Sequence, residues 1–95
     1  MTEKTLLEAC VRYRQRLEQE GITAVDHAAE VLPSLLLERE QLEHVRWMLE
    51  QLCSGAIDDR EKVMRWLGFI QGVFWSCGYY TIQTMRTHNT TPAAI

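Results

Sequence analysis

An excess of basic residues is absent from this 95-residue sequence, which has 10 Lys and Arg against 13 Asp and Glu and a net charge of −3. Proteins that bind nucleic acid usually present a basic patch or stripe, because much of their affinity comes from neutralising phosphates. The densest basic run consists of three arginines surrounded by glutamates: Arg12, Arg14 and Arg16, with Glu8, Glu18 and Glu20. This pattern indicates a mixed-charge solvated face and disfavours nucleic acid as a partner.

Paired cysteines are also absent. The three cysteines, Cys10, Cys53 and Cys77, are odd in number, widely spaced, and in no Cys-x-x-Cys motif. A disulfide framework of a secreted domain has an even, closely spaced set, so we expect buried thiols in a reducing compartment. The polar, acidic start of the chain lacks the pattern of a signal peptide. Together these features predict a cytoplasmic protein.

Catalytic and cofactor motifs are missing as well. There is no glycine-rich phosphate loop, and Glu40 and His44 form a single Glu–His pair, whereas a di-metal bundle needs a repeated motif. We therefore expect no catalytic residue, no metal and no cofactor. An acidic set loosely resembles the magnesium-binding clusters of all-helical nucleotide pyrophosphatases, which keeps a metal-dependent nucleotide hydrolase as an alternative: Glu40, Glu43, Asp58 and Asp59.

Helical periodicity is present along most of the chain. Apolar spacing and caps predict four main helices over 5–20, 24–31, 34–53 and 59–77, with a short helix over 82–88. The starts are assigned to capping sequences at Thr5–Glu8, Thr23–Asp26, Asp58–Glu61 and Thr81. The stops are assigned to Gly21, Pro33, Gly55, Gly78 and Asn89. The prediction is an all-α bundle, with one domain over 1–89 and a flexible tail over 90–95.

The stretch from Trp66 to Met85 contains no charged residue. Its 20 positions could nominally span a membrane, but polar residues interrupt it and Gly78 to Thr81 forms a helix stop and a new cap. We therefore expect no membrane contact, and a central helix over 59–77 that is fully buried and apolar nearly all round. Gly68, Gly72 and Ser76 recur every four residues, which predicts a surface where another backbone approaches closely.

Several residues are candidates for an interface. Trp47 lies away from the apolar stripe of its helix, so its ring covers neighbouring side chains or contacts another helix or subunit. The apolar content of 46% is high for one small core. We therefore predict a homodimer and a further protein partner. The predicted interface residues are Trp47, Gly68, Gly72, Ser76, Tyr79 and Tyr80.

Three short motifs near the C-terminus carry a resemblance to a known group of proteins. They are Arg-Trp-Leu-Gly-x-Ile-Gln-Gly at Arg65–Gly72, Gly-x-Tyr-Thr-Ile at Gly78–Ile82, and His88-Asn89. This segment of about 25 residues resembles small hypothetical accessory proteins of tailed phages and prophages of enteric bacteria. The resemblance implies a phage accessory protein that is made in the host cytoplasm and acts by binding.

The sequence thus favours a non-enzymatic protein-interaction module that binds and modulates a host or phage protein. Two alternatives stay open. One is a nucleic-acid-associated regulator that uses the arginines near residue 14, and the other is the metal-dependent nucleotide hydrolase.

Overall fold

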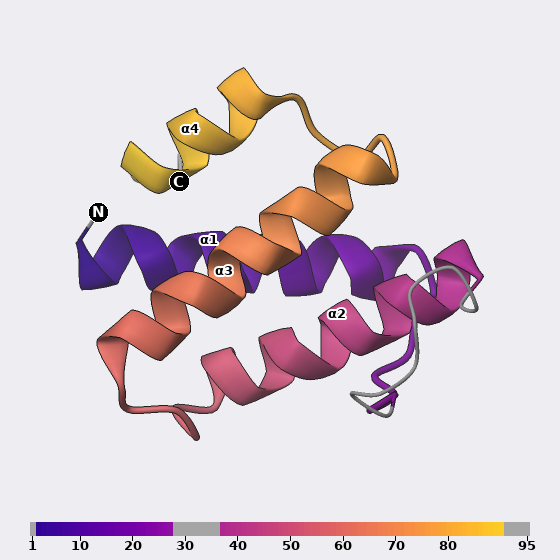
Figure 1. Cartoon of the computed structure of the whole chain (residues 1–95), viewed down its shortest axis with the longest axis horizontal. Coiled ribbons are helices and arrows are strands. Elements are labelled where there is room, and N and C mark those ends of the chain that lie inside the picture. Colours follow the sequence, from indigo (N-terminus) through magenta and orange to yellow (C-terminus); the bar gives the residue numbers. More distant parts are fainter. Residues whose placement is uncertain (1, 28–36, 91–95) are drawn as a thin grey trace.

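The computed structural model describes residues 2–27 and 37–90, and within these ranges it contains four α-helices and no strand. The helices are α1 (Glu3–Gln19), α2 (Glu38–Cys53), α3 (Arg60–Ser76) and α4 (Ile82–Thr90). The all-α prediction is confirmed. Figure 1 shows α3 crossing in front of α1, with α2 lying beside α3 and α4 folded back near the start of α1.

Glycine ends each of the first three helices. Gly21, Gly55 and Gly78 have φ of +74°, +76° and +77°, which a residue with a side chain rarely adopts. In each case the amide of the following residue donates a hydrogen bond back into the last helical turn, as from Tyr79 to the Phe74 carbonyl at 2.8 Å. These are Schellman turns, and the predicted stops at the three glycines are confirmed.

Some predicted caps are wrong by a few residues. α1 begins at Glu3 because Thr2, not Thr5, is the cap, and its hydroxyl accepts from the Thr5 amide at 3.1 Å. The cap of α3 is Asp59 instead of Asp58. The cap at Thr81 is confirmed, since its hydroxyl accepts from the Thr84 amide at 3.0 Å. Asn89 does not end α4 in a left-handed conformation, because the helix continues to Thr90 and no residue other than glycine has positive φ in the described ranges.

The predicted helix over 24–31 is wrong over residues 24–27, which are irregular. The amide of Val25 donates to the Glu43 carbonyl at 3.2 Å, and the amide of His27 donates to His44 Nδ1 at 3.2 Å. These amides are satisfied by α2 instead of by a local helix, which would be too short to be stable alone. Residues 28–36 lie outside the described ranges. The rest of the predicted helix over 24–31 and the start of the predicted helix over 34–53 therefore lie outside them as well. In the structure α2 begins at Glu38. Residues 91–95, most of the predicted tail, also lie outside.

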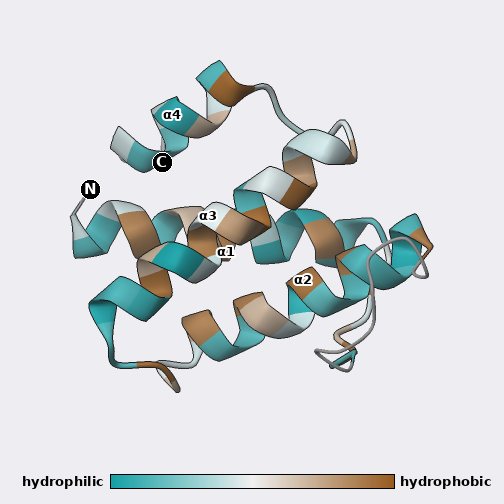
Figure 2. Cartoon of the chain, viewed as in Figure 1, coloured by the Kyte–Doolittle hydropathy of each residue, from teal (hydrophilic) through white to brown (hydrophobic). Residues whose placement is uncertain are grey.

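The core is formed by one apolar stripe from each helix. α1 packs against α2 and α4, and α2 packs against α3. The largest fully buried side chains are Tyr13, Leu17, Val45, Leu49, Leu67, Ile70 and Phe74. In Figure 2 hydrophilic and hydrophobic residues alternate along α1 and α2, whereas α3 is pale to brown along much of its length.

The prediction that the helix over 59–77 is fully buried is wrong. Only Leu67, Ile70 and Phe74 of α3 are buried, all on one side of the helix. The three other helices of the described residues leave one side of α3 uncovered, and that side faces solvent. No helix among the described residues is long and apolar enough to cross a membrane.

Candidate interaction surface on helix α3

The exposed side of α3 is unusually apolar. We call it the α3 outer face, and it consists of Met64, Arg65, Gly68, Phe69, Gly72, Trp75 and Ser76, all exposed. The Phe69 and Trp75 side chains are 55% and 58% exposed, and Met64 is 39% exposed. Single exposed apolar residues are common, but several on one helix face mark interaction surfaces.

Two glycines lie in the middle of this face. A Cβ atom added at Gly68 or Gly72 would meet no atom within 4 Å, apart from the helix's own neighbouring backbone. The predicted close approach of another backbone therefore does not occur within the described chain. A flat strip of backbone runs along the α3 outer face, with large side chains beside it.

A shallow depression lies on the α2 side of the strip. It has a volume of about 300 Å³ and is lined by His44, Trp47, Met48, Arg65, Trp66 and Phe69. The Trp47 ring is half-buried, with its centroid 6.1 Å from that of Trp66 and 5.7 Å from that of His44. Trp47 therefore contacts another helix of its own chain, which was one of the two interpretations of its position off the apolar stripe.

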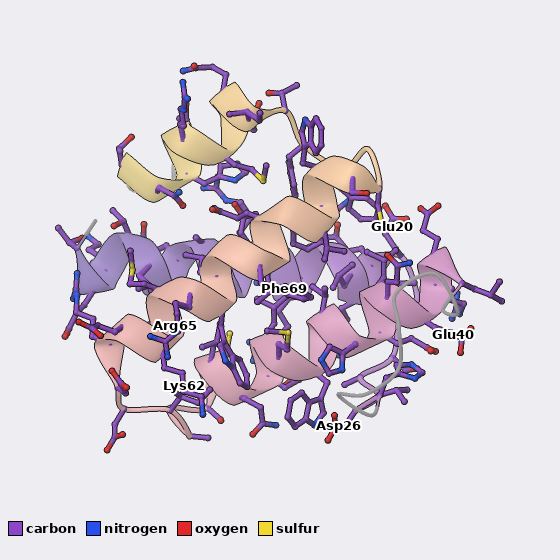
Figure 3. All side chains as sticks on the ribbon, viewed as in Figure 1. Glu20, Asp26, Glu40, Lys62, Arg65 and Phe69 are labelled. Carbon is purple, nitrogen blue, oxygen red and sulfur yellow. The ribbon has the colours of Figure 1, made fainter. Side chains whose placement is uncertain are left out.

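Two cations border this depression. Lys62 Nζ lies 5.4 Å from the centre of the Trp66 ring, and Arg65 is part of the lining itself. Figure 3 shows Lys62, Arg65 and Phe69 along α3, with Glu20 and Glu40 at the other end of the molecule. Two cations thus lie on the α3 side of the depression, whereas Asp26 Oδ1 lies 3.8 Å from His44 Nδ1 on its α2 side.

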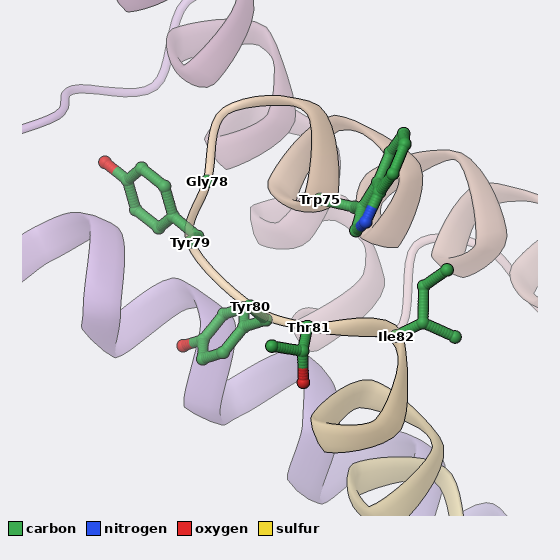
Figure 4. A pocket seen from close by; sticks show the side chains of 6 residues that line it. All are labelled: Trp75, Gly78, Tyr79, Tyr80, Thr81 and Ile82. Carbon is green, nitrogen blue, oxygen red and sulfur yellow. The ribbon is translucent and has the colours of Figure 1, made fainter.

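A second depression lies between the end of α3 and the start of α4. It has a volume of about 400 Å³ and is lined by Trp75, Gly78, Tyr79, Tyr80, Thr81 and Ile82. Figure 4 shows Trp75 and Ile82 on one side of the connecting loop, and the rings of Tyr79 and Tyr80 on the other side, toward α1. Ile82 is 52% exposed, so it extends the apolar surface of Trp75.

Tyr79 and Tyr80 are half-buried and contribute only part of their surface to this depression. The Tyr79 ring stacks on Phe74 with centroids 5.4 Å apart, and Tyr80 contacts Tyr13 at 5.4 Å. The Arg16 guanidinium lies 4.7 Å from the centre of the Tyr79 ring. Both tyrosines therefore have an internal packing role.

A buried polar network lies next to Tyr80, and the sequence analysis missed it. The Tyr13 hydroxyl lies 2.9 Å from His88 Nδ1 and accepts a hydrogen bond from Gln71 Nε2 at 3.0 Å. Gln71 and Asn89 also exchange two amide hydrogen bonds, of 2.7 and 3.3 Å. Burial raises the pKa of Tyr13 to about 12, and burial, with a smaller contribution from Arg12, lowers the pKa of His88. The network joins α1, α3 and α4, and the signal that could have revealed it was Gln71, a polar residue in the uncharged stretch.

The four acidic residues considered for a metal site are divided between the two ends of α2. At the start of α2, Glu40 Oε1 accepts a hydrogen bond from the Leu37 amide at 3.1 Å. Asp59 lies beyond the other end of α2, where it caps α3. His27 Nε2 and Glu43 Oε1 lie 3.4 Å apart, but no group of three or more His, Cys, Asp or Glu side chains in the described ranges could hold a metal ion. Burial lowers the pKa of His44, whose Nδ1 is already used as an acceptor by the His27 amide.

The cysteines and arginines have internal surroundings. Burial raises the pKa of the Cys10 thiol to about 12 and raises that of Cys53 and Cys77 to a lesser extent, which makes all three thiols poor nucleophiles. Arg16 pairs with Glu20 at 2.9 Å and Arg14 with Glu50 at 3.9 Å. Two of the three arginines in the predicted basic run therefore interact with carboxylates of the same chain.

The α3 outer face is thus the most distinctive surface feature of the described residues, and the predicted interface residues divide around it. Gly68, Gly72 and Ser76 lie on it, Trp47 lines the depression on its α2 side, and Tyr79 and Tyr80 line the depression at its end. Phe69, Trp75, Met64 and Arg65 were not predicted as members. Comparison of the chain with protein-family models, with curated proteins and with solved structures gave no match.

Proposed function

We propose that this chain is a non-enzymatic protein-interaction module that binds a helix of a partner protein along the α3 outer face. The observation that carries the proposal is the strip at Gly68 and Gly72, which lies open between Phe69 and Trp75. Each glycine in a helix interior costs about 1 kcal/mol relative to alanine. Nothing in the described part of the chain occupies the space that these glycines leave, so an external backbone is the natural occupant.

The geometry of the strip favours a helix over an extended peptide. Exposed backbone on α3 is already hydrogen-bonded within the helix, so it offers no edge for a strand to pair with. A helix can instead lie across the glycines and place its side chains beside Phe69 and Trp75. The resemblance to phage and prophage accessory proteins, which would act by binding in the host cytoplasm, supports the same proposal.

Site-specific photo-cross-linking in living cells tests the proposal. The cross-linking amino acid p-benzoylphenylalanine would replace Phe69, and the control would carry it at Gln15, an exposed position of α1. We expect a covalent adduct from position 69, much weakened by a second change of Trp75→Ser, and none from position 15. Equal adducts from both positions, or none from position 69, would contradict the proposal.

A further inference from the structure

We infer that the helix bound by the α3 outer face is α3 of a second copy of this chain, paired in antiparallel orientation about a two-fold axis between Gly68 and Gly72. This inference rests on the proposed function, because it names the occupant of the same surface. It is argued from the arrangement of residues around α3, from their charges and from the area available.

The two edges of the α3 outer face have different residues. With 100° between successive residues of an α-helix, Gly68 and Gly72 lie near the middle of the face. Met64 and Trp75 lie along one edge, and Phe69 and Ser76 lie along the other. All are exposed, and a Cβ atom added at either glycine would meet no other element within 4 Å.

An antiparallel two-fold pairing makes these edges match. It brings each edge against the same edge of the second copy. A residue that lies a given number of positions before the midpoint between the glycines then faces a residue that lies as many positions after it. Trp75 lies five residues after the midpoint and Met64 six before it, so Trp75 of one copy meets Met64 of the other at nearly the same height. At the midpoint, Gly68 of one copy faces Gly72 of the other, where the missing Cβ atoms allow close approach.

The other edge is matched in the same way. Phe69 lies one residue before the midpoint, so the two Phe69 rings meet beside the axis, within reach of stacking. A thioether beside an indole and a pair of phenyl rings are both favourable contacts. The exposed apolar residues of α3 therefore complement themselves without any change of backbone.

Charge distinguishes the antiparallel pairing from the parallel one. Arg65 belongs to the α3 outer face, and Glu61 lies one turn before it; both are exposed and lie close to the line through Gly68 and Gly72. A parallel pairing would bring each against its own equivalent, which is a repulsive arrangement. The antiparallel pairing instead brings Arg65 beside Ser76 in the last turn of α3 of the second copy, where free helix carbonyls favour a cation.

The area of the face indicates the strength of the pairing. Aromatic side chains bury about 150–250 Å² each, and Phe69 and Trp75 are each more than half exposed. Together with Met64, Arg65 and the glycine strip, two such faces would bury on the order of 1,000 Å², which is at the lower limit for a specific interface. We therefore expect a dimer that dissociates in the micromolar range.

Disulfide trapping tests the orientation. The background is Cys53→Ala with Cys77→Ala, and the buried Cys10 stays in place. Two variants, Met64→Cys and Trp75→Cys, are mixed and oxidised gently. We expect the mixed 64–75 disulfide to form about tenfold more than either symmetric disulfide. In the control, Gln15→Cys mixed with either variant should give mixed and symmetric disulfides in random proportions. A preference for 64–64 and 75–75 disulfides would overturn the antiparallel arrangement.

Sedimentation equilibrium of the unaltered chain tests the pairing itself. We expect Gly72→Leu to raise the dissociation constant at least about tenfold, and Gln15→Leu, which adds the same side chain on α1, to leave it unchanged. Circular dichroism of both variants checks that they are folded. A chain that stays monomeric up to millimolar concentration would overturn the inference.

The photo-cross-linking experiment separates this inference from the proposed function. A self-adduct from position 69 supports both. An adduct only with another protein, together with a monomer in sedimentation, overturns the self-pairing and leaves the proposed function in place. Absence of any adduct from position 69 overturns the proposed function, and a monomer in sedimentation then overturns the self-pairing as well.

Discussion

At the scale of single residues, the Tyr13 hydroxyl holds three helices together. It belongs to α1, accepts from Gln71 of α3 and contacts His88 of α4. We expect Tyr13→Phe to lower the free energy of unfolding by about 1–3 kcal/mol, because the buried His88 Nδ1 loses its partner. Urea denaturation measures the change.

Tyr79→Phe is the matched control for this prediction, because the described residues show no hydrogen bond to the Tyr79 hydroxyl. It removes the same atom from a half-buried ring and should change the unfolding free energy by less than about 0.5 kcal/mol. Equal effects of the two substitutions would show that the network at Tyr13 contributes nothing beyond packing.

His44 and His88 should make the stability of the fold depend on pH. Burial lowers the pKa of His88 and of His44 below 6.5 in the folded chain, so the unfolded chain binds more protons as the pH falls. Their contribution to stability is complete above pH 6.5 and is lost as the pH falls from that value through the lower folded pKa. Melting temperatures across this window should decrease toward acid, and the double variant His44→Gln with His88→Gln should show a flatter profile. An unchanged profile would contradict this assignment.

At the scale of the elements, the glycines of α3 have opposite roles. At Gly68 and Gly72 an added methyl group meets nothing within 4 Å, so Gly68→Ala and Gly72→Ala should each stabilise the isolated chain by up to about 1 kcal/mol. Gly78 has φ of +77°, so Gly78→Ala should destabilise it by about 1 kcal/mol. Thermal melts at concentrations too low for association would measure all three, and the same sign for all would contradict the structure.

The helices themselves could largely be predicted from the sequence, because apolar periodicity and glycine stops are local signals. Gly21, Gly55 and Gly78 end helices as expected. Local signals did not predict the cap at Thr2 or the irregular backbone at Val25. Several nearby residues can serve as caps, and the amides of Val25 and His27 bond to α2, which is distant in sequence.

The candidate surface was predictable in part for a similar reason. The spacing of Gly68 and Gly72 indicates a flat strip whether or not a neighbour covers it. Which side of an apolar helix faces the core depends on how many other helices surround it, and this is a property of the whole fold. Phe69 and Trp75 were therefore assigned to a buried helix, although the structure leaves them exposed.

At the scale of the whole molecule, α4 closes the fold. Met85 and His88 of α4 are buried, and α4 packs against α1. A chain that ends at Thr81 would expose Tyr13 and Tyr80 and lose the burial of Met85, which alone contributes roughly 1.5–3 kcal/mol. We expect a broad, weakly cooperative melt and increased binding of a hydrophobic dye. A sharp melt at the temperature of the full chain would show that α4 is dispensable.

The contacts of the Tyr13 hydroxyl also predict the tautomer of His88. Gln71 donates to its oxygen, and His88 Nδ1 lies 2.9 Å from the same oxygen; we therefore expect the hydroxyl to donate to Nδ1 and neutral His88 to carry its own hydrogen on Nε2. In that arrangement each group would donate to the next, from Gln71 of α3 through Tyr13 of α1 to His88 of α4. In a nitrogen-15 NMR spectrum of the imidazole groups, His88 should show the signature of a single tautomer, and loss of that signature would report the separation of α4 from α1.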